Sequence, residues 1–105
     1  MKNFFEPKVI AIIGASNHKE KVGYSLMSNL KKFKGEIIPI NLHEKKIFGK
    51  KCYRSVLDFK ERIDLAVIAI PANSAKKVLE ECGKKQIKNI ITISAGFSEI
   101  SNKKA

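Results

Sequence analysis

The sequence contains no tryptophan, only two cysteines and no long apolar run. A membrane-spanning helix takes about 20 consecutive apolar residues, so we expect no membrane partner. Cys52 and Cys82 are isolated and lack the paired spacing of a zinc site, which is typical of reduced thiols in a cytoplasmic protein and predicts no bound metal. The first residues also lack the apolar stretch and cleavage site of a secretory signal, which favours a cytoplasmic location.

Acidic residues are scarce beside basic ones, with 10 Asp and Glu against 21 Lys and Arg, for a net charge of +11. Only Arg54 and Arg62 are arginines. Two interpretations of this charge stand: a solvated lysine surface, or a positive field that attracts a polyanionic ligand. Nucleic acid is not the expected ligand, because aromatic residues do not alternate with the basic ones and no helix-turn-helix, zinc-finger or RNA-recognition signature occurs.

A length of 105 residues with 44% hydrophobic content predicts one globular domain over residues 1–105, with a polar tail from about residue 100. Apolar runs and helical spacing alternate along it. They predict strands at 8–14, 36–41, 65–70 and 89–94, and helices at 22–33 and 73–85. This alternation predicts an α/β fold, a Rossmann-like parallel sheet with helices on both faces.

Single residues refine these boundaries. Gly35 is expected just past the first helix, Asn73 is expected to cap the second, and Ser55 to cap a short turn at 55–58. Pro39 suggests an edge strand or a locally unpaired position, because proline cannot donate to a ladder. Residues 43–51 read as a lysine-rich loop. The second helix is expected to turn four side chains inward: Ala75, Val78, Leu79 and Cys82.

The first strand stops abruptly at Gly14-Ala15-Ser16, and Gly23 follows where a helix begins. Glycine at the end of a buried strand allows a tight turn and close approach of a ligand. The free amides at the start of the next helix favour anions. This loop therefore predicts a phosphate-binding site.

The ends of all four strands are small, polar or shape-fixing. They are residues 14–16, 41–42, 71–73 and 94–96. Ligands of parallel α/β sheets bind outside the carboxyl ends of the strands. The four ends together predict one cleft.

The residues alone do not decide which nucleotide the predicted site binds. Ser16 stands where a dinucleotide-binding loop has its second glycine, and the neutral Asn41 stands where an NAD site has an acidic residue. Asn41 followed by Lys45 and Lys46 tolerates a phosphorylated ribose, which both NADP and coenzyme A carry. Composition does not separate these two ligands.

Seven blocks in order resemble a known family. They are Ile13-Gly14-Ala15-Ser16, Lys21-Val22-Gly23, Ile38-Pro39-Ile40-Asn41, Gly49 with Tyr53-Arg54-Ser55-Val56, residues 64–72, Glu80-Glu81-Cys82-Gly83 and residues 93–99. Together they resemble the CoA-binding domain of ADP-forming acyl-CoA synthetases, such as ADP-forming acetate–CoA ligase and the α subunit of succinate–CoA ligase. The resemblance covers residues 4–99.

The resemblance implies a site for coenzyme A. Phosphates would lie against Gly14, Ala15, Ser16 and the helix start at Lys21, Val22 and Gly23. Asn41 and Lys46 would lie near the phosphorylated ribose and adenine. Pro71 and Ala72, with Ser94, Ala95 and Gly96, would line the path of the pantetheine arm.

The sequence departs from the family in two ways. Leu42 stands where the family usually has proline, and the family's domain continues through another helix and strand, so the expected fold is truncated. His18 and His43 match no phosphohistidine site, and no catalytic residue is expected. We therefore expect a CoA or acyl-CoA binding module, a fragment or subunit that works with other synthetase domains or self-associates. The alternatives are an NADP-binding oxidoreductase or a nucleotide-sensing or interaction domain.

Overall fold

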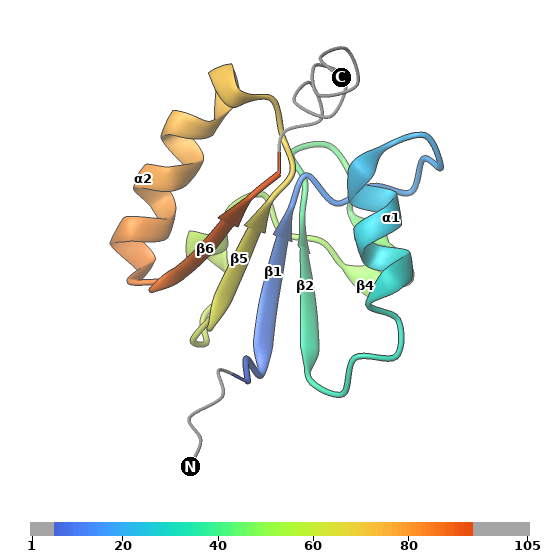
Figure 1. The fold of residues 1–105 in the computed structure, drawn as a ribbon, viewed down its shortest axis with the longest axis horizontal. Coiled ribbons are helices and arrows are strands. Elements are labelled where there is room, and N and C mark those ends of the chain that lie inside the picture. The colour runs from blue at the N-terminus through green and yellow to red at the C-terminus, as the bar shows by residue number, and fades with distance from the viewer. Residues whose placement is uncertain (1–5, 94–105) are drawn as a thin grey trace, which may run out of the picture.

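The computed structural model describes residues 6–93. Its central sheet has four parallel strands: β1 (Val9–Ile13), β2 (Glu36–Ile40), β5 (Leu65–Ile68) and β6 (Asn89–Thr92). They lie in the order β2-β1-β5-β6, and all four arrows run the same way (Figure 1). The carboxyl ends of the strands therefore meet at one edge, as expected from the sequence.

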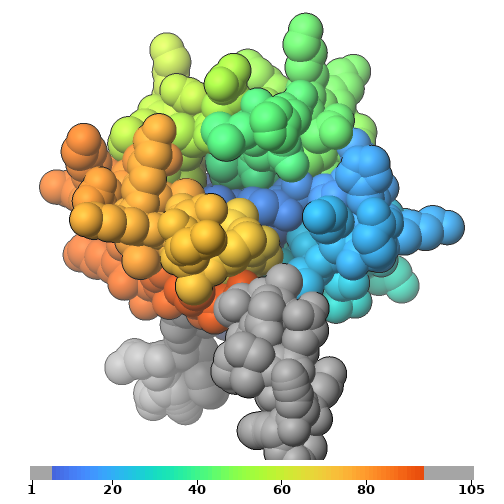
Figure 2. All heavy atoms as spheres, turned by 90° about the horizontal axis from the view of Figure 1, so that it is seen from above, coloured from blue at the N-terminus to red at the C-terminus, as the bar shows by residue number. Residues whose placement is uncertain are grey.

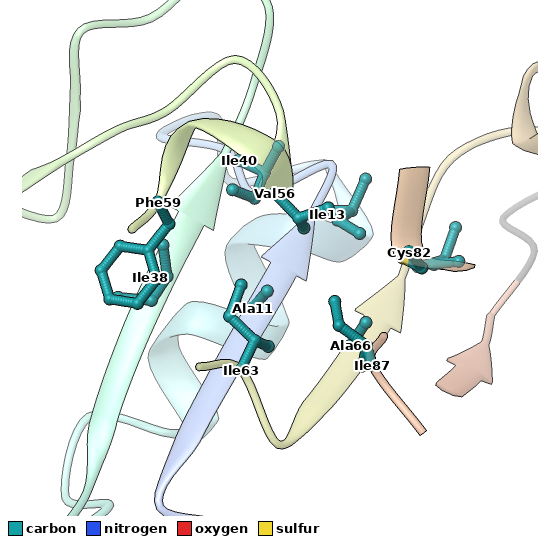
Figure 3. Packing of buried hydrophobic residues seen from close by; sticks show 11 residues of the cluster. Ala11, Ile13, Ile38, Ile40, Val56, Phe59, Ile63, Ala66, Cys82 and Ile87 are labelled. Atoms are coloured by element: carbon teal, nitrogen blue, oxygen red, sulfur yellow. The ribbon is translucent and has the colours of Figure 1, made fainter. Parts of the chain in front are cut away.

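The two helices cover opposite faces of the sheet. α1 (Val22–Asn29) places Met27 in a buried cluster with Ile10, Ile12 and Val67. α2 (Ala75–Lys85) and the short 3-10 helix η1 (Val56–Asp58) cover the other face, where Ala11 and Ile13 lie (Figure 3). Neighbouring residues of β1 divide between the two clusters because side chains alternate along a strand. The Rossmann-like α/β fold is confirmed.

β2 is an edge strand, as Pro39 predicts. Pro39 lies opposite Ile12 of β1 and has no amide hydrogen to donate on its outer side. The segment at Tyr53 covers part of this edge: the Tyr53 amide donates to the Pro39 carbonyl over 3.0 Å, and the Asn41 amide donates to the Tyr53 carbonyl over 2.9 Å. This pairing brings residues 53–55 beside the end of β2.

The lysine-rich segment is not the simple loop that the sequence predicts. It contains a small antiparallel hairpin, β3 (Lys46–Ile47) and β4 (Lys50–Lys51). The two turn residues, Phe48 and Gly49, both have positive φ, 54° and 75°, as a two-residue hairpin turn requires. Ile47 fixes the hairpin in place, because its side chain is fully buried on the α1 face of the sheet.

α1 is shorter than predicted, ending at Asn29 rather than at residue 33. The chain then tightens: the Lys31 amide donates to the Ser28 carbonyl over 3.3 Å, and the Phe33 amide donates to the Leu30 carbonyl over 3.0 Å. Gly35 is therefore not a helix cap. A Cβ at Gly35 would overlap the Lys8 carbonyl oxygen, so glycine is needed here for close approach to the segment before β1.

α2 also begins differently from the prediction. The 3-10 helix η2 (Ala72–Ser74) precedes it, and Ser74 rather than Asn73 is the N-cap residue, with no side-chain cap bond. Pro71 accounts for this, because its φ of −58° starts the η2 turn one residue before Asn73.

The inward face of α2 is narrower than predicted. Ala75 and Cys82 are buried and Val78 packs against the core, but Leu79 is 42% exposed. Positions 75, 78 and 82 share one helical stripe, and position 79 lies at its margin. The Ser55 cap is confirmed, because its Oγ accepts from the Leu57 amide over 3.0 Å.

No helix among residues 6–93 is both long enough and apolar enough to span a membrane.

Candidate functional site

Two glycines hold the start of α1 directly against the end of β1. Gly14 has a φ of +95°, and a Cβ there would lie 2.5 Å from the Ala69 carbonyl oxygen. A Cβ on Gly23 would overlap the carbonyl oxygen of Gly14 itself. Both positions therefore exclude a side chain, and the loop between them presents its backbone at the carboxyl edge of the sheet.

The first turn of α1 suits an anion. Lys21 is its N-cap residue and makes no side-chain cap bond, and the turn contains no acidic residue. The amides of Val22 and Gly23 open the helix, where amide hydrogens lack partners within the helix and the helix dipole favours negative charge. Such a terminus is a favourable place for a phosphate.

Ser16 shapes this loop from inside. Its side chain is 6% exposed, and its Oγ accepts a hydrogen bond from the His18 amide over 2.9 Å. The hydroxyl can still donate its own hydrogen, because it has used only an acceptor position. A direct contact between Ser16 and a phosphate stays a prediction.

Asn41 links the loops that follow β1 and β2. Its Nδ2 donates to the Ala15 carbonyl over 2.9 Å, while its Oδ1 accepts from the amides of His43 and Glu44 over 2.7 and 3.1 Å. The side chain is thus held by the protein on both sides. Asn41 positions the loops around the site.

A cavity of about 610 Å³ opens beside these loops. Gly14, Asn41 and Pro71 of the predicted site line it, at the ends of β1, β2 and β5. Figure 2 views this edge from above, where the surface is hollowed between the green and the orange parts of the chain. The volume lies in the range of ligand pockets, roughly 300–1,000 Å³.

Much of the cavity wall was missed by the sequence analysis. Beyond the three residues already named, the lining consists of Ile13, Ile40, Leu42, His43, Arg54, Ser55, Ile70, Ser74, Lys77, Val78 and Glu81. Ser55 joins two walls, because its Oγ donates to Glu81 Oε1 over 2.8 Å. The spacing of Ser74, Lys77, Val78 and Glu81 could have signalled one helix face, since residues three and four apart are neighbours on a helix.

The remaining predicted residues fall into three groups. Ala15, Ser16, Lys21, Val22 and Gly23 build the loop and helix start, and Ala72 is exposed in η2. Lys46 lies in β3 and does not line the cavity; its carbonyl accepts from Asn17 Nδ2 over 3.0 Å. Ser94, Ala95 and Gly96 lie outside the described residues.

A second cavity, of about 460 Å³, lies at the opposite end of the sheet between residues 60–64 and 85–89. Parallel sheets bind ligands at their carboxyl ends, which favours the larger cavity as the site. Within residues 6–93, no group of three His, Cys, Asp or Glu side chains is placed to hold a metal ion.

Neither cysteine is activated by its surroundings. Burial raises the pKa of the Cys52 thiol, whose Sγ lies 3.8 Å from the Asn41 carbonyl oxygen. Burial also raises the pKa of the Cys82 thiol inside the core. Both remain in the unreactive thiol form at neutral pH.

A parallel sheet, a glycine-shaped loop and a cavity at the carboxyl edge are typical of a Rossmann-like nucleotide-binding domain. The family model described as CoA binding domain matches residues 8–105. The chain therefore belongs to the CoA-binding domain family.

Named relatives agree with this. The chain is 56% identical over 102 residues to the ADP-forming acetate–CoA ligase of Methanocaldococcus jannaschii, covering 97% of this chain and 14% of that protein. It is 49% identical over 100 residues to the ADP-forming 4-hydroxybutyrate–CoA ligase of Nitrosopumilus maritimus, covering 94% and 14%. The chain thus spans a small part of the curated relatives it matches.

A solved structure matches the fold. Dinucleotide forming acetyl-coenzyme A synthetase 1 of Ca. Korarchaeum cryptofilum superposes with a TM-score of 0.84 at 37% identity, covering 95% of this chain and 22% of that one.

Proposed function

We propose that this chain binds coenzyme A at the carboxyl edge of its sheet. The observation that carries the proposal is the cavity of about 610 Å³ beside the Gly14–Gly23 loop. The loop and the first turn of α1 offer backbone amides to the diphosphate. The cavity offers an apolar slot, with Ile40, Ile70 and Val78 in its lining, to the adenine ring.

Family membership supports this choice of ligand over NADP, the alternative that composition leaves open. The pantetheine arm would leave along Pro71, which lies at the cavity, and onward past the predicted Ser94, Ala95 and Gly96. Contact of CoA with Ser16 and Lys21 is part of the same proposal. Lys46 is its weakest member, because its backbone is bonded to Asn17 of the loop but it does not line the cavity.

Calorimetric titration of the full chain with CoA at moderate salt tests the proposal. Ser74→Trp fills the cavity with an indole, and we expect it to weaken CoA binding at least tenfold. Asn73→Trp is the matched control, because Asn73 is exposed in the same turn and does not line the cavity. Equal loss in both variants, or no binding by the folded parent chain, contradicts the proposal. NADPH titrated by its fluorescence tests the alternative, and binding as tight as that of CoA would favour it.

We further propose that the chain is the CoA-holding part of an ADP-forming acyl-CoA synthetase. Such an enzyme converts acyl-CoA, ADP and phosphate into acid, CoA and ATP. One similar relative is named as a ligase of acetate and another as a ligase of 4-hydroxybutyrate. The residues of this chain therefore do not identify the acyl group. We expect the chain alone to bind acetyl-CoA without forming ATP from ADP and phosphate; ATP formation in a luciferase assay would contradict this assignment.

A further inference from the structure

We propose that Arg54 and Lys77 hold the phosphate monoester on the ribose of the ligand, and so make the site selective for CoA over dephospho-CoA. The inference rests on the proposed function. It replaces Lys46 as the partner of this phosphate.

The first observation is the charge of the cavity wall. Arg54 and Lys77 are the arginine and lysine side chains in its lining. Arg54 and Lys77 are both exposed. Within residues 6–93 the one ion pair joins Arg62 to Asp64, so neither Arg54 nor Lys77 is paired with a carboxylate. The guanidinium and the ammonium group are thus available to a ligand.

The second observation is the contact that sets the two cations on adjoining walls. Ser55 Oγ donates to Glu81 Oε1 over 2.8 Å, which fastens the start of η1 to α2. Arg54 directly precedes Ser55, and Lys77 lies one helical turn before Glu81 on the same face. Two buried residues hold these walls on the core, Val56 in η1 and Cys82 in α2.

The third observation is that the other predicted partners of this phosphate are already bonded or do not line the cavity. Both polar atoms of the Asn41 side chain are bonded to backbone groups, and Lys46 does not line the cavity. A phosphate monoester carries between one and two negative charges near neutral pH. Arginine matches it well, because the planar guanidinium can donate two parallel hydrogen bonds to phosphate oxygens.

Titration of the full chain with CoA and with dephospho-CoA, which lacks only this phosphate, tests the inference. We expect Arg54→Ala to weaken CoA binding about tenfold and to change dephospho-CoA binding less than twofold. Lys77→Met, which keeps most of the apolar stem, should act in the same direction with a smaller loss. Arg62→Ala is the control of equal charge, because Arg62 lies at the opposite end of the sheet in the lining of the smaller cavity.

Glu81→Gln provides a change of opposite sign. The glutamine oxygen can still accept from Ser55, while the loss of a negative charge from the wall should tighten CoA binding about twofold. Urea midpoints of all variants separate binding effects from unfolding. A CoA to dephospho-CoA affinity ratio that Arg54→Ala and Lys77→Met leave unchanged overturns the inference alone. Failure of the parent chain to bind either nucleotide overturns the proposed function as well.

Discussion

The contact between Gly23 and the Gly14 carbonyl makes a strong prediction about stability. In Gly23→Ala, the new Cβ would overlap the Gly14 oxygen and lie 2.8 Å from its carbonyl carbon and 2.9 Å from Ala15 Cα. Ordinary contacts of a Cβ begin near 3.4 Å, and these neighbours are backbone atoms that cannot rotate away. The start of α1 must therefore retreat from β1.

We expect this retreat to cost about 3 kcal/mol, at the upper end of the usual range for overpacking. A domain of this size has a total stability of about 5–15 kcal/mol, so the midpoint of thermal unfolding should fall by roughly 12–24 °C. Thermal and urea unfolding, followed by circular dichroism, measure both quantities.

Gly83→Ala is the matched control. Gly83 lies within α2, and a Cβ there would meet nothing within 4 Å. Alanine should stabilise the helix by about 0.5–1 kcal/mol, because it loses less backbone entropy on folding than glycine. A Gly23→Ala variant as stable as the parent chain, or a Gly83→Ala variant destabilised as much as Gly23→Ala, would refute the reasoning.

Three further predictions concern single side chains. Asn41→Ala removes three hydrogen bonds, one to the loop after β1 and two to amides of its own loop, so we expect a loss of about 2 kcal/mol by urea unfolding and weaker CoA binding. Asn41→Asp, which keeps the acceptor oxygen, should lose less; equal losses in both would contradict this. The backbone amide of Lys8, together with that of Val9 and with Arg62, lowers the pKa of Asp64. Its stabilising contribution is therefore present above about pH 4, the usual value in an unfolded chain, and is lost as the pH falls through the lower folded value; urea midpoints from pH 6 to pH 2 should fall less steeply in Asp64→Asn. Iodoacetamide should label Cys52 before the fully buried Cys82, both more slowly than in urea, because burial raises the pKa of each thiol; native Cys82 labelled as fast as Cys52 would contradict this.

Local sequence patterns predicted the sheet well. β1 and β5 are apolar runs buried on both faces, and such strands leave a plain signal. Gly14 and Gly23 also predicted the tight turn between β1 and α1, because their role depends on two elements that follow one another in the chain. Four strands, two helices and the edge of the sheet that carries the cavity followed from these signals.

Contacts between distant segments account for what was missed. The hairpin at 46–51 depends on Ile47 packing under the α1 face, which no local pattern in a lysine-rich stretch reveals. Arg54 and Lys77 both line the cavity although they are far apart in the sequence, and the bond between Ser55 and Glu81 joins their segments. Lys46 was chosen over its lysine neighbours without a contact to decide between them; it lies in β3, and its role stays a prediction.

The central claim is that CoA occupies the carboxyl edge of the sheet. Amide chemical shifts of the isotope-labelled chain, recorded while CoA is added, test this claim most directly. We expect the largest shifts on Gly14 to Gly23, on Asn41, on Arg54 and Ser55, and on Ser74 to Glu81. Shifts that gather instead at residues 60–64 and 85–89, around the cavity at the opposite edge, would contradict it.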